Sequence, residues 1–336
     1  MKPLTIRDIA RLSGCSVTTV SRVMNHKPDV SASTRARVEE VLRQQQFVGN
    51  ANARGLKQAG SEAVAVILRG RGSVFMGDVA EAIVSRAAGS GVPWLIEYID
   101  EWADEVTAAL RLSRERPLAG LVFVGGHIDG RYKALEALTL PLVFVTVSAE
   151  GTPLRRAASV SIDDRGMAEQ AVYTLLQRGC RRVAVFGGGA GGQAGDSLSL
   201  RYQGALDAHR ALGLSFDPRL YVPTRFTLDS ACRAARKHFT AFPDTDAAFC
   251  MSDLVALGVI RALHEMGLKV PEDVSVIGVD GMELGQYYIP RLSTIVQPVE
   301  ELAGNTVRVM RDMMENGGPA RHITVDARLR LTESVR

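Results

Sequence analysis

The chain has 336 residues, of which 46% are hydrophobic and 23% are charged, and its formal net charge is +3. At about 100 to 200 residues per domain, this length predicts two or three domains with full apolar cores. No apolar run approaches the roughly 18 residues of a membrane helix, and the first residues lack the apolar segment of a signal peptide. These features exclude a membrane protein and favour a cytoplasmic one. The four cysteines lie far apart with no metal-ligand spacing, so neither a metal site nor a disulfide framework is expected.

The charge is distributed unevenly along the chain. Residues 1–60 carry ten Lys and Arg against four Asp and Glu, a net of +6, whereas the remainder carries 30 against 33. A basic head on a mildly acidic body indicates a module that binds a polyanion, joined to a module of a different kind.

The basic head predicts three short helices. Thr5 followed by Asp8 has the form of a capping box at the start of the first helix. Gly14 is expected to end that helix, and Ser16 can cap the second. A third helix is expected to open at residues 31–34 and to close the core. Helix, tight turn, helix is the arrangement of a helix-turn-helix, whose second helix lies in the major groove of DNA.

Short hydroxyl side chains are dense around the second helix, at Ser16, Thr18, Thr19 and Ser21. Such donors can bond phosphates at close approach, while Arg22 can contact a guanine through two hydrogen bonds. The alternative is a small helical bundle whose hydroxyls only cap and solvate its helices.

The run TIRDIARLSGCSVTTVSRVMN at residues 5–25, followed by Val30-Ser31 and Thr34-Arg35, closely resembles the head of the lactose/galactose repressor family. The resemblance implies a homodimer on a pseudo-palindromic operator of double-stranded DNA. The base contacts that it implies are Val17, Thr18 and Arg22. The phosphate contacts that it implies are Thr5, Ser16, Thr19, Ser21, Asn25, Ser31 and Thr34.

Residues 47–60 join the head to the body and resemble the hinge helix and linker of the same family. Gly49 and Gly55 each weaken so short a helix by about 1 kcal/mol relative to Ala, so it should need help to fold. The family pairs two hinge helices in the minor groove, where a leucine pair wedges open a base step. A flexible linker is the alternative. The minor-groove contacts that the resemblance implies are Asn50, Ala53, Arg54 and Leu56.

From residue 61 onward, short apolar runs alternate with amphipathic helical stretches. Apolar runs at 64–68, 120–124, 183–186 and 274–279 are of this kind, and 166–178 is typical of the helical stretches. Such alternation predicts an α/β fold with parallel sheets covered by helices, and there is enough of it for two sheets. A ligand is then expected at the carboxyl ends of the strands, between two lobes.

The body also resembles the periplasmic-binding-protein-like body with which these repressors sense small molecules. Matching stretches include Arg201-Tyr-Gln-Gly, Met251-Ser-Asp-Leu and Val270 to Asp280. The expected domains are a helix-turn-helix head at 1–46, a hinge helix and linker at 47–60, a first lobe at 61–160 plus 292–322 and a second lobe at 161–291 plus 323–336.

By the same resemblance, Arg201 and Asp280 would hold the effector. A guanidinium donates hydrogen bonds and a carboxylate accepts them, which suits the adjacent hydroxyls of a polyol. Phe226 would stack on the apolar face of a sugar ring. Without the resemblance, an interlobe or surface ion pair would be the preferred interpretation of an Arg and an Asp so far apart in sequence. The complete set of expected effector contacts is Phe75, Thr146, Arg201, Phe226, Ser252 and Asp280.

Some residues depart from the family pattern and bear on the ligand. Asp164 and Ser252 each stand where the family usually has an asparagine. Arg69 and Arg71 follow the first strand, where the family often has a proline and a hydrophobic residue. Two extra cations there favour an anionic sugar, unless they are solvated loop arginines.

Residues 187–192, Gly-Gly-Gly-Ala-Gly-Gly, fit the dinucleotide-binding pattern GxGxxG, and Asp207 lies at about the spacing of a ribose carboxylate. Against a nucleotide site, glycines continue to Gly195 before a helix can begin near Ser197, whereas that fingerprint needs the helix to open within the motif. An NAD-dependent enzyme that uses this glycine run is nevertheless an alternative. A cytoplasmic sugar-binding protein without a DNA role is another.

The sequence thus predicts a cytoplasmic, nucleoid-associated transcriptional regulator, most simply a repressor, with no enzymatic activity and no cofactor. Its effector is expected to be a small sugar or sugar derivative. A ligand that favours lobes holding the two hinge segments apart would weaken DNA binding, and one that holds them together would strengthen it.

Overall fold

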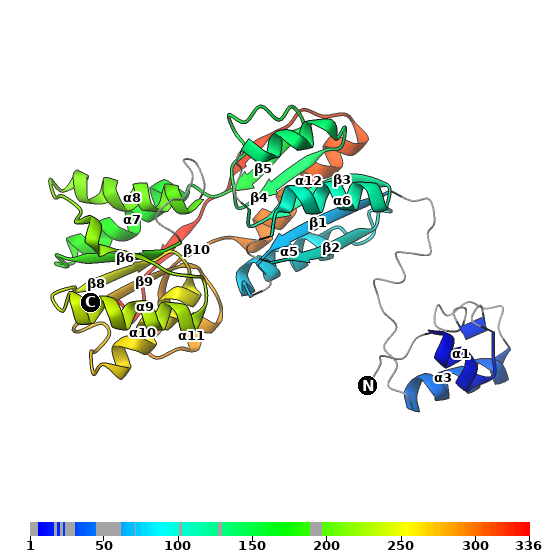
Figure 1. Ribbon diagram of the computed structural model, residues 1–336, viewed down its shortest axis with the longest axis horizontal. Helices are drawn as coiled ribbons and strands as arrows, with labels where there is room; N and C mark the ends of the chain where they lie inside the picture. The colour runs from blue at the N-terminus through cyan, green and yellow to red at the C-terminus, as the bar shows by residue number, and fades with distance from the viewer. Residues whose placement is uncertain are drawn as a thin grey trace. The chain divides into compact units, whose positions relative to one another are not determined.

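Figure 1 shows the computed structural model of the chain, which divides into two compact units, residues 1–61 and 62–336. The structure describes residues 6–16, 19–20, 23, 31–44, 62–70, 72–100, 103–126, 130–188 and 197–336. Within these ranges, none of the helices is long and apolar enough to cross a membrane.

The smaller unit begins with helix α1 (Ile6–Ser13), which ends at a glycine as expected. Gly14 has a φ of 63°, a conformation that favours glycine. The amide of Cys15 donates to the carbonyl oxygen of Ala10 over 3.0 Å, which closes the end of the helix. Residues 19, 20 and 23 are helical, and the last helix of the unit is α3 (Ala32–Gln44).

A small apolar core joins the three helical segments of this unit. Its side chains come from all three segments, and Cys15 and Val41 pack against it. This core confirms the three-helix head that the sequence predicts. Its buried members are Ala10, Val20, Val23 and Val38.

The first sheet of the larger unit has the strand order β11-β5-β4-β3-β1-β2, and every neighbouring pair is parallel. Along β1, Val64, Val66 and Leu68 face one helical layer while Ala65 and Ile67 face the other, so both faces of the sheet are buried. The strands are β1 (Ala63–Arg69), β2 (Trp94–Ile99), β3 (Leu118–Val124), β4 (Leu142–Val145), β5 (Ala157–Ser161) and β11 (His322–Thr324).

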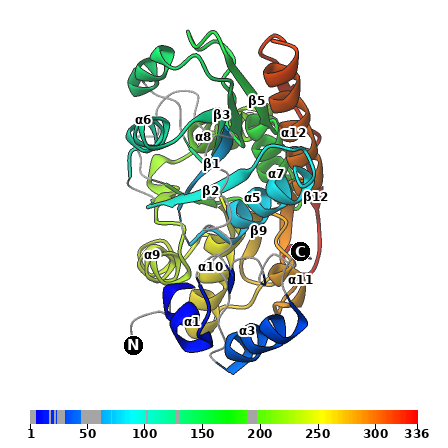
Figure 2. The same cartoon turned by 90° about the vertical axis from the view of Figure 1, so that its right-hand side faces the viewer.

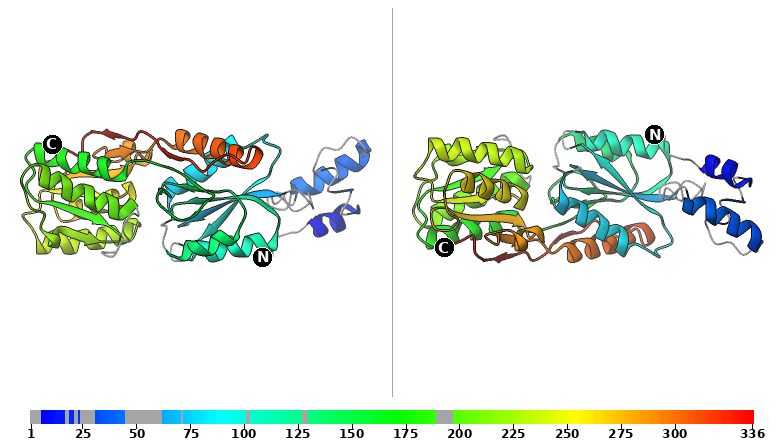
Figure 3. Two further views of the ribbon diagram at one scale, coloured as in Figure 1. Left: turned by 90° about the horizontal axis from the view of Figure 1, so that it is seen from above. Right: turned by 90° about the horizontal axis from the view of Figure 1, so that it is seen from below.

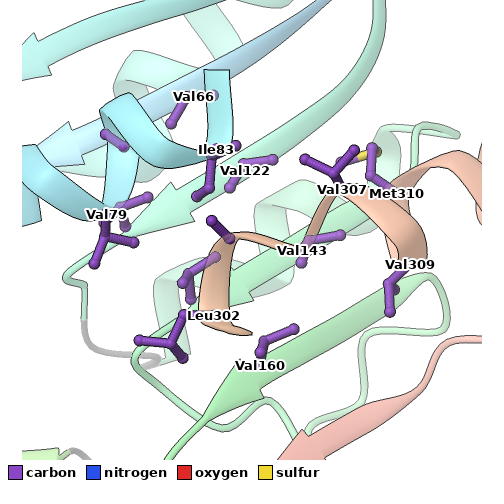
Figure 4. Packing of buried hydrophobic residues seen from close by; sticks show 14 of the residues in the cluster. Val66, Val79, Ile83, Val122, Val143, Val160, Leu302, Val307, Val309 and Met310 are labelled. Carbon is purple, nitrogen blue, oxygen red and sulfur yellow. The ribbon is translucent and has the colours of Figure 1, made fainter. Parts of the chain in front are cut away.

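Helices cover both faces of this sheet. α5 and α12 pack on one face, and α6 with the 3-10 helix η1 packs on the other, so that α12 and α6 lie on opposite sides (Figure 3). α12 runs beside β5 (Figure 2). Figure 4 shows Ile83 of α5 and Leu302 of α12 packed over Val66 and Val143. The helices are α5 (Val74–Arg86), α6 (Glu105–Glu115), η1 (Gly130–Ala137) and α12 (Val299–Glu315).

The second sheet has the order β12-β10-β9-β8-β6-β7, parallel except for the antiparallel pair β10–β12. Helices α7 and α8 cover one face, and α9 and α10 cover the other. The strands are β6 (Val183–Gly187), β7 (Tyr221–Pro223), β8 (Ala247–Cys250), β9 (Ser275–Asp280), β10 (Ser293–Val296) and β12 (Arg328–Arg330). The helices are α7 (Asp164–Gln177), α8 (Ser197–Ala211), η2 (Pro218–Leu220), α9 (Leu228–Ala241), α10 (Asp253–Glu265) and α11 (Leu284–Tyr287).

These two sheets and their helices are the two lobes, and the chain crosses between them after β5, after β10 and between β11 and β12 (Figure 1). The first two crossings leave from the carboxyl ends of β5 and β10. The carboxyl edges of both sheets therefore lie at the junction of the lobes. The two-lobed α/β fold predicted from the sequence is confirmed.

Two of the expected lobe boundaries differ from the structure. Residues 292–322 were expected in the first lobe, but β10 pairs with β9 in the second sheet, so this crossing follows β10. Similarly, β11 pairs with β5 through Thr324, so the last crossing follows that residue. The sequence of a short β-branched strand does not indicate which sheet the strand will join, because its apolar pattern fits either sheet.

Gly204 provides a test of how closely α7 and α8 pack. A Cβ at this position would lie against the carbonyl oxygen of Arg165 and the amide of Glu169, both backbone atoms of α7. We expect Gly204→Ala to lower the free energy of unfolding by about 1 to 3 kcal/mol, because neither helix backbone can yield without strain. Urea unfolding followed by circular dichroism measures this change.

The matched control is Gly77→Ala in α5, where nothing lies within 4 Å of an added Cβ. Alanine costs less conformational entropy than glycine in a helix, so this substitution should stabilise the protein by about 0.5 to 1 kcal/mol. Equal effects of the two substitutions would contradict the close approach of α7 and α8.

Candidate functional site

The carboxyl edge of the first sheet brings together three residues singled out from the sequence. Arg69 ends β1, Thr146 follows β4, and Phe75 lies in the first turn of α5. Thr146 is 4% exposed, has a φ of 70°, and its amide donates to the carbonyl oxygen of Val160. Phe75 is buried in the apolar layer under α5, so in this structure its ring packs against the core of the lobe.

Arg69 belongs to a buried polar cluster. Its Nη1 lies 3.3 Å from Oε2 of Glu105, the first residue of α6, and the Tyr132 hydroxyl donates to Oε1 of Glu105 over 2.5 Å. Glu105 is 3% exposed. Arg69 is therefore a charge-compensated side chain, and neither of the two interpretations from the sequence, an anion-binding cation or a solvated arginine, describes it. Arg71 lies outside the described residues.

Glu105 was not singled out from the sequence. The only local signal was its position after Asp104, the N-cap of α6, where acidic residues are common for reasons of helix capping alone. Nothing in the local pattern indicated that its side chain turns inward to meet β1 and η1.

At the carboxyl edge of the second sheet, Arg201 of α8 is held on two sides. Its Nε donates to Oδ1 of Asp164 over 2.7 Å, and its Nη1 donates to the carbonyl oxygen of Met251 over 2.6 Å. Both members of the ion pair are almost fully buried, with Arg201 6% and Asp164 3% exposed. The close partner of Arg201 is thus Asp164, the first residue of α7, and this pairing was not predicted.

Asp280 ends β9, and Gln297, which follows β10, is hydrogen-bonded to it. Gln297 Nε2 donates to Oδ1 of Asp280 over 2.9 Å, and the Gln297 amide donates to its carbonyl oxygen. Burial and the nearby Asp253 carboxyl raise the pKa of Asp280 well above its usual value, against a lowering influence of Arg201. Gln297 is 3% exposed, and its Oε1 meets no hydrogen-bond donor among the described residues. Sequence reasoning missed Gln297, which follows β10 as a lone polar side chain.

The first turn of α10 carries a third polar group. Ser252 is the N-cap, with Oγ accepting from the Val255 amide over 3.2 Å. Asp253 is fully buried and accepts from the Thr294 hydroxyl over 2.6 Å and from the Met282 amide over 2.7 Å. Burial raises the pKa of Asp253 to about 7, although these hydrogen bonds act in the opposite direction. Asp253 ties α10 to β10, and Met282 also packs into the apolar layer of the first lobe.

The glycine run at 187–192 is described only as far as Gly188. A Cβ at Gly187 would meet the sulfur of Met251, and one at Gly188 would meet Leu198, so packing explains both glycines. α8 spans Ser197–Ala211, and residues 189–196 lie outside the described residues. Asp207, the candidate ribose carboxylate, is already paired with Arg165 over 2.6 Å. Phe226 is partly buried and packs against the helical layers on both faces of the sheet.

In the smaller unit, two hydroxyl pairs lie at helix starts. Ser16 Oγ accepts from the Thr19 amide over 3.0 Å and lies 2.8 Å from its hydroxyl. Ser31 Oγ donates to the Thr34 hydroxyl over 2.9 Å and accepts from its amide. Helix starts with hydroxyls suit phosphate oxygens. The other expected DNA-contact residues lie outside the described residues: Thr5, Val17, Thr18, Ser21, Arg22, Asn25, Asn50, Ala53, Arg54 and Leu56.

Both units are similar to known proteins. Residues 5–50 match the family described as bacterial regulatory proteins, lacI family, and residues 172–335 match the family described as periplasmic binding protein-like domain. The chain is 30% identical over 331 residues to the HTH-type transcriptional regulator MalR of Clostridium butyricum, an alignment covering 97% of each chain.

Two solved structures are similar along almost the whole chain. One is a complex of the transcriptional regulator CelR with cellobiose, at a TM-score of 0.73 and 25% identity, covering 98% of this chain and 99% of that one. The other is the lac repressor dimer bound to operator and the anti-inducer ONPF, at a TM-score of 0.71 and 25% identity, covering 99% of each chain.

The raised pKa of Asp253 gives a pH-dependence that can be tested. Because its folded pKa of about 7 lies above the ordinary 3.8, the folded protein binds more protons than the unfolded chain between these values. Asp253 therefore lowers stability as the pH rises through that window. We expect Asp253→Asn to lose less stability than wild type between pH 4.5 and pH 7.5, measured by urea unfolding.

Thr294→Val is the matched control, because it removes a hydrogen bond to the same carboxyl without removing the titrating group. Because that hydrogen bond lowers the pKa of Asp253, this variant should keep or enlarge the wild-type change with pH, although its stability is lower at both pH values. The interpretation would be wrong if Asp253→Asn and wild type changed in parallel over this window.

Proposed function

This chain belongs to the lacI family of bacterial regulatory proteins, and we propose that it is a repressor that binds a pseudo-palindromic operator as a homodimer under the control of a small carbohydrate-like effector. It is a DNA-binding transcriptional regulator with a helix-turn-helix head and a periplasmic-binding-protein-like body. The observation that carries the proposal is the union of these parts in one chain. A basic head with hydroxyl pairs at its helix starts is joined to a body whose buried polar groups gather at strand ends.

On DNA, the proposal assigns base contacts to Val17, Thr18 and Arg22, because the second helix of such a head enters the major groove. The phosphate contacts are the hydroxyl pairs at the helix starts, together with Thr5, Ser21 and Asn25. The hinge contacts in the minor groove are Asn50, Ala53, Arg54 and Leu56. The protein thus acts on the nucleoid, in the cytoplasm.

For the effector, the proposal keeps Arg201 and Asp280 and adds Gln297. Oε1 of Gln297 is a buried acceptor that a ligand hydroxyl can satisfy, and an unsatisfied buried acceptor costs about 1 to 3 kcal/mol. The carboxyl oxygens of Asp280 can accept hydrogen bonds from a ligand hydroxyl, and the Arg201 guanidinium can donate them. This combination suits the mixed donor and acceptor character of a polyol. Thr146, Ser252, Phe226 and Phe75 complete the proposed site.

The homodimer is supported by exposed apolar side chains on the second lobe. Leu284, Tyr287 and Ile289 follow one another along α11 and the segment after it, and they are 50%, 78% and 90% exposed. An apolar patch of this kind is typical of a protein interface. A second copy of the chain is the proposed occupant, because one short glycine-containing hinge helix cannot wedge the minor groove alone.

Two other functions would lead to different observations. An NAD-dependent enzyme would bind cofactor without residues 1–60, but the carboxylate that such a site needs is engaged by Arg165. A sugar-binding protein without a DNA role would leave the +6 head, with ten Lys and Arg against four Asp and Glu, unexplained.

The proposal is tested by selecting fragments of the source genome with the purified full-length protein at near-physiological salt, where nonspecific phosphate binding is weak. The expected result is enrichment of a two-fold motif whose recovery changes when the sugar handled by the neighbouring genes is added. Recovery of fragments without a common motif, with and without candidate sugars, would overturn it.

Leu56→Ala should weaken binding to the selected operator at least tenfold while changing binding to random DNA less than twofold. The reason is that an inserted leucine stabilises the complex only at the deformed central base step of a specific site. Fluorescence anisotropy on both DNA sequences measures the two affinities.

Leu12→Ala is the control for that experiment, because it truncates a half-exposed leucine of α1. It should change binding to both DNAs little. Equal losses on operator and random DNA for Leu56→Ala would count against the wedge.

Ile289→Asp should raise the dimer dissociation constant at least tenfold, because it places a charge in the centre of the proposed interface. Sedimentation velocity over a range of protein concentrations measures it. The control is Leu214→Asp, an equally apolar and 48% exposed site that lies elsewhere on the second lobe. If both variants dissociate alike, or neither does, the patch is not the dimer interface.

A further inference from the structure

The ion pair between Arg201 and Asp164 sets the charge that a ligand meets at the carboxyl edge of the second sheet. The guanidinium uses Nε for Asp164 and one N–H of Nη1 for the carbonyl oxygen of Met251. Two of its five N–H donors are thereby fixed, and the group cannot turn without breaking both hydrogen bonds. The side chains of the pair are only 8% and 3% exposed, so bulk water does not screen their attraction.

Three buried acidic side chains lie at the same edge. Asp164, Asp253 and Asp280 are 3%, 0% and 9% exposed, and Arg201 lies close enough to Asp280 to lower its pKa. Repulsion by the Asp253 carboxyl also raises the pKa of Asp280. Arg201 is therefore already paired with a carboxylate, and further carboxyl groups lie close to it on the same edge.

In the part of the first lobe that the structure describes, the arginine at the carboxyl edge is also paired with a carboxylate. Arg69, which ends β1, lies 3.3 Å from Glu105, whose other oxygen accepts from the Tyr132 hydroxyl. Each of these two arginines thus has a buried carboxylate as its partner. A ligand carboxylate or phosphate would have to give up its hydration to reach groups that offer no net positive charge, and that desolvation is costly.

We propose that Asp164 is a specificity-determining residue, which neutralises and orients Arg201 so that the effector site accepts an uncharged polyol and rejects sugar acids and sugar phosphates. The inference rests on the proposed function, since it concerns the effector site of the regulator. It also differs from the interpretation of Arg69 and Arg71 in the sequence, which favoured an anionic sugar as the effector. Arg201 remains able to donate from its other N–H groups to hydroxyl oxygens, for which a full positive charge is not required.

The test compares sulfate binding by the full-length wild type, Asp164→Asn, Arg201→Gln and the double variant Asp164→Asn/Arg201→Gln. Sulfate is the probe because it needs only a free guanidinium and no knowledge of the sugar. Thermal unfolding is followed against sodium sulfate, with sodium chloride at matched ionic strength as the reference. Circular dichroism establishes that each variant is folded.

We expect Asp164→Asn to gain at least tenfold in sulfate affinity over wild type, because the arginine loses its anionic partner while the amide still accepts from Nε. The double variant should lose this gain. Asp164→Ser, a second uncharged replacement, should behave like Asp164→Asn and serves if the first variant does not fold.

Two results would overturn the proposal. One is a folded Asp164→Asn that binds sulfate no better than wild type. The other is sulfate binding by wild type that Arg201→Gln abolishes, because the arginine would then be open to anions in the presence of Asp164. This second arm needs no Asp164 variant. Operator binding is measured separately, so loss of the regulator function and loss of the anion result can be told apart.

Discussion

Charged side chains that leave water must find partners inside the protein, because an unpaired buried ion costs several kcal/mol. The second lobe meets this constraint repeatedly at the carboxyl edge of its sheet. Arg201 is matched by Asp164, Asp253 by donors from two other segments, and Asp280 by Gln297. Each partnership joins different elements: α8 to α7, α10 to β10, and β9 to the segment that crosses to the first lobe. The arrangement of the lobe at this edge therefore depends on them.

The carboxyl edges of the two sheets each hold a residue whose backbone conformation is rare for residues other than glycine. Thr146 after β4 has a φ of 70° and Asp280 at the end of β9 has a φ of 125°, although neither is a glycine. Both residues are buried. Strain of this kind persists where the surrounding structure holds it in place, and it gathers at ligand sites. This backbone strain occurs in both lobes, at the edges where the chain crosses between them. Such a distribution is expected for a ligand that contacts both lobes.

The head shows how one group can serve stability and recognition. The hydroxyls of Ser16 and Ser31 accept from amides near the start of a helix, which satisfies donors that would otherwise lack a partner. Their pairing with Thr19 and Thr34 leaves hydroxyl groups at the surface, next to the positive end of the helix dipole. A helix-capping role and a phosphate-binding role therefore do not exclude each other. The positive charge of the whole head is what distinguishes a DNA-binding domain from a small helical bundle.

The sequence by itself determined the features that depend on neighbouring residues. The end of α1 at Gly14, the three-helix head and the alternation that builds two parallel sheets all follow from capping, turn chemistry and periodicity. Only the tertiary structure decided which sheet β10 joins and which carboxylate meets which arginine. Asp164 and Arg201 are 37 residues apart, and nothing local distinguishes a buried pair from two solvated charges. Partner choice is settled by packing between distant segments, because the energy of a buried charge depends on everything that replaces its water.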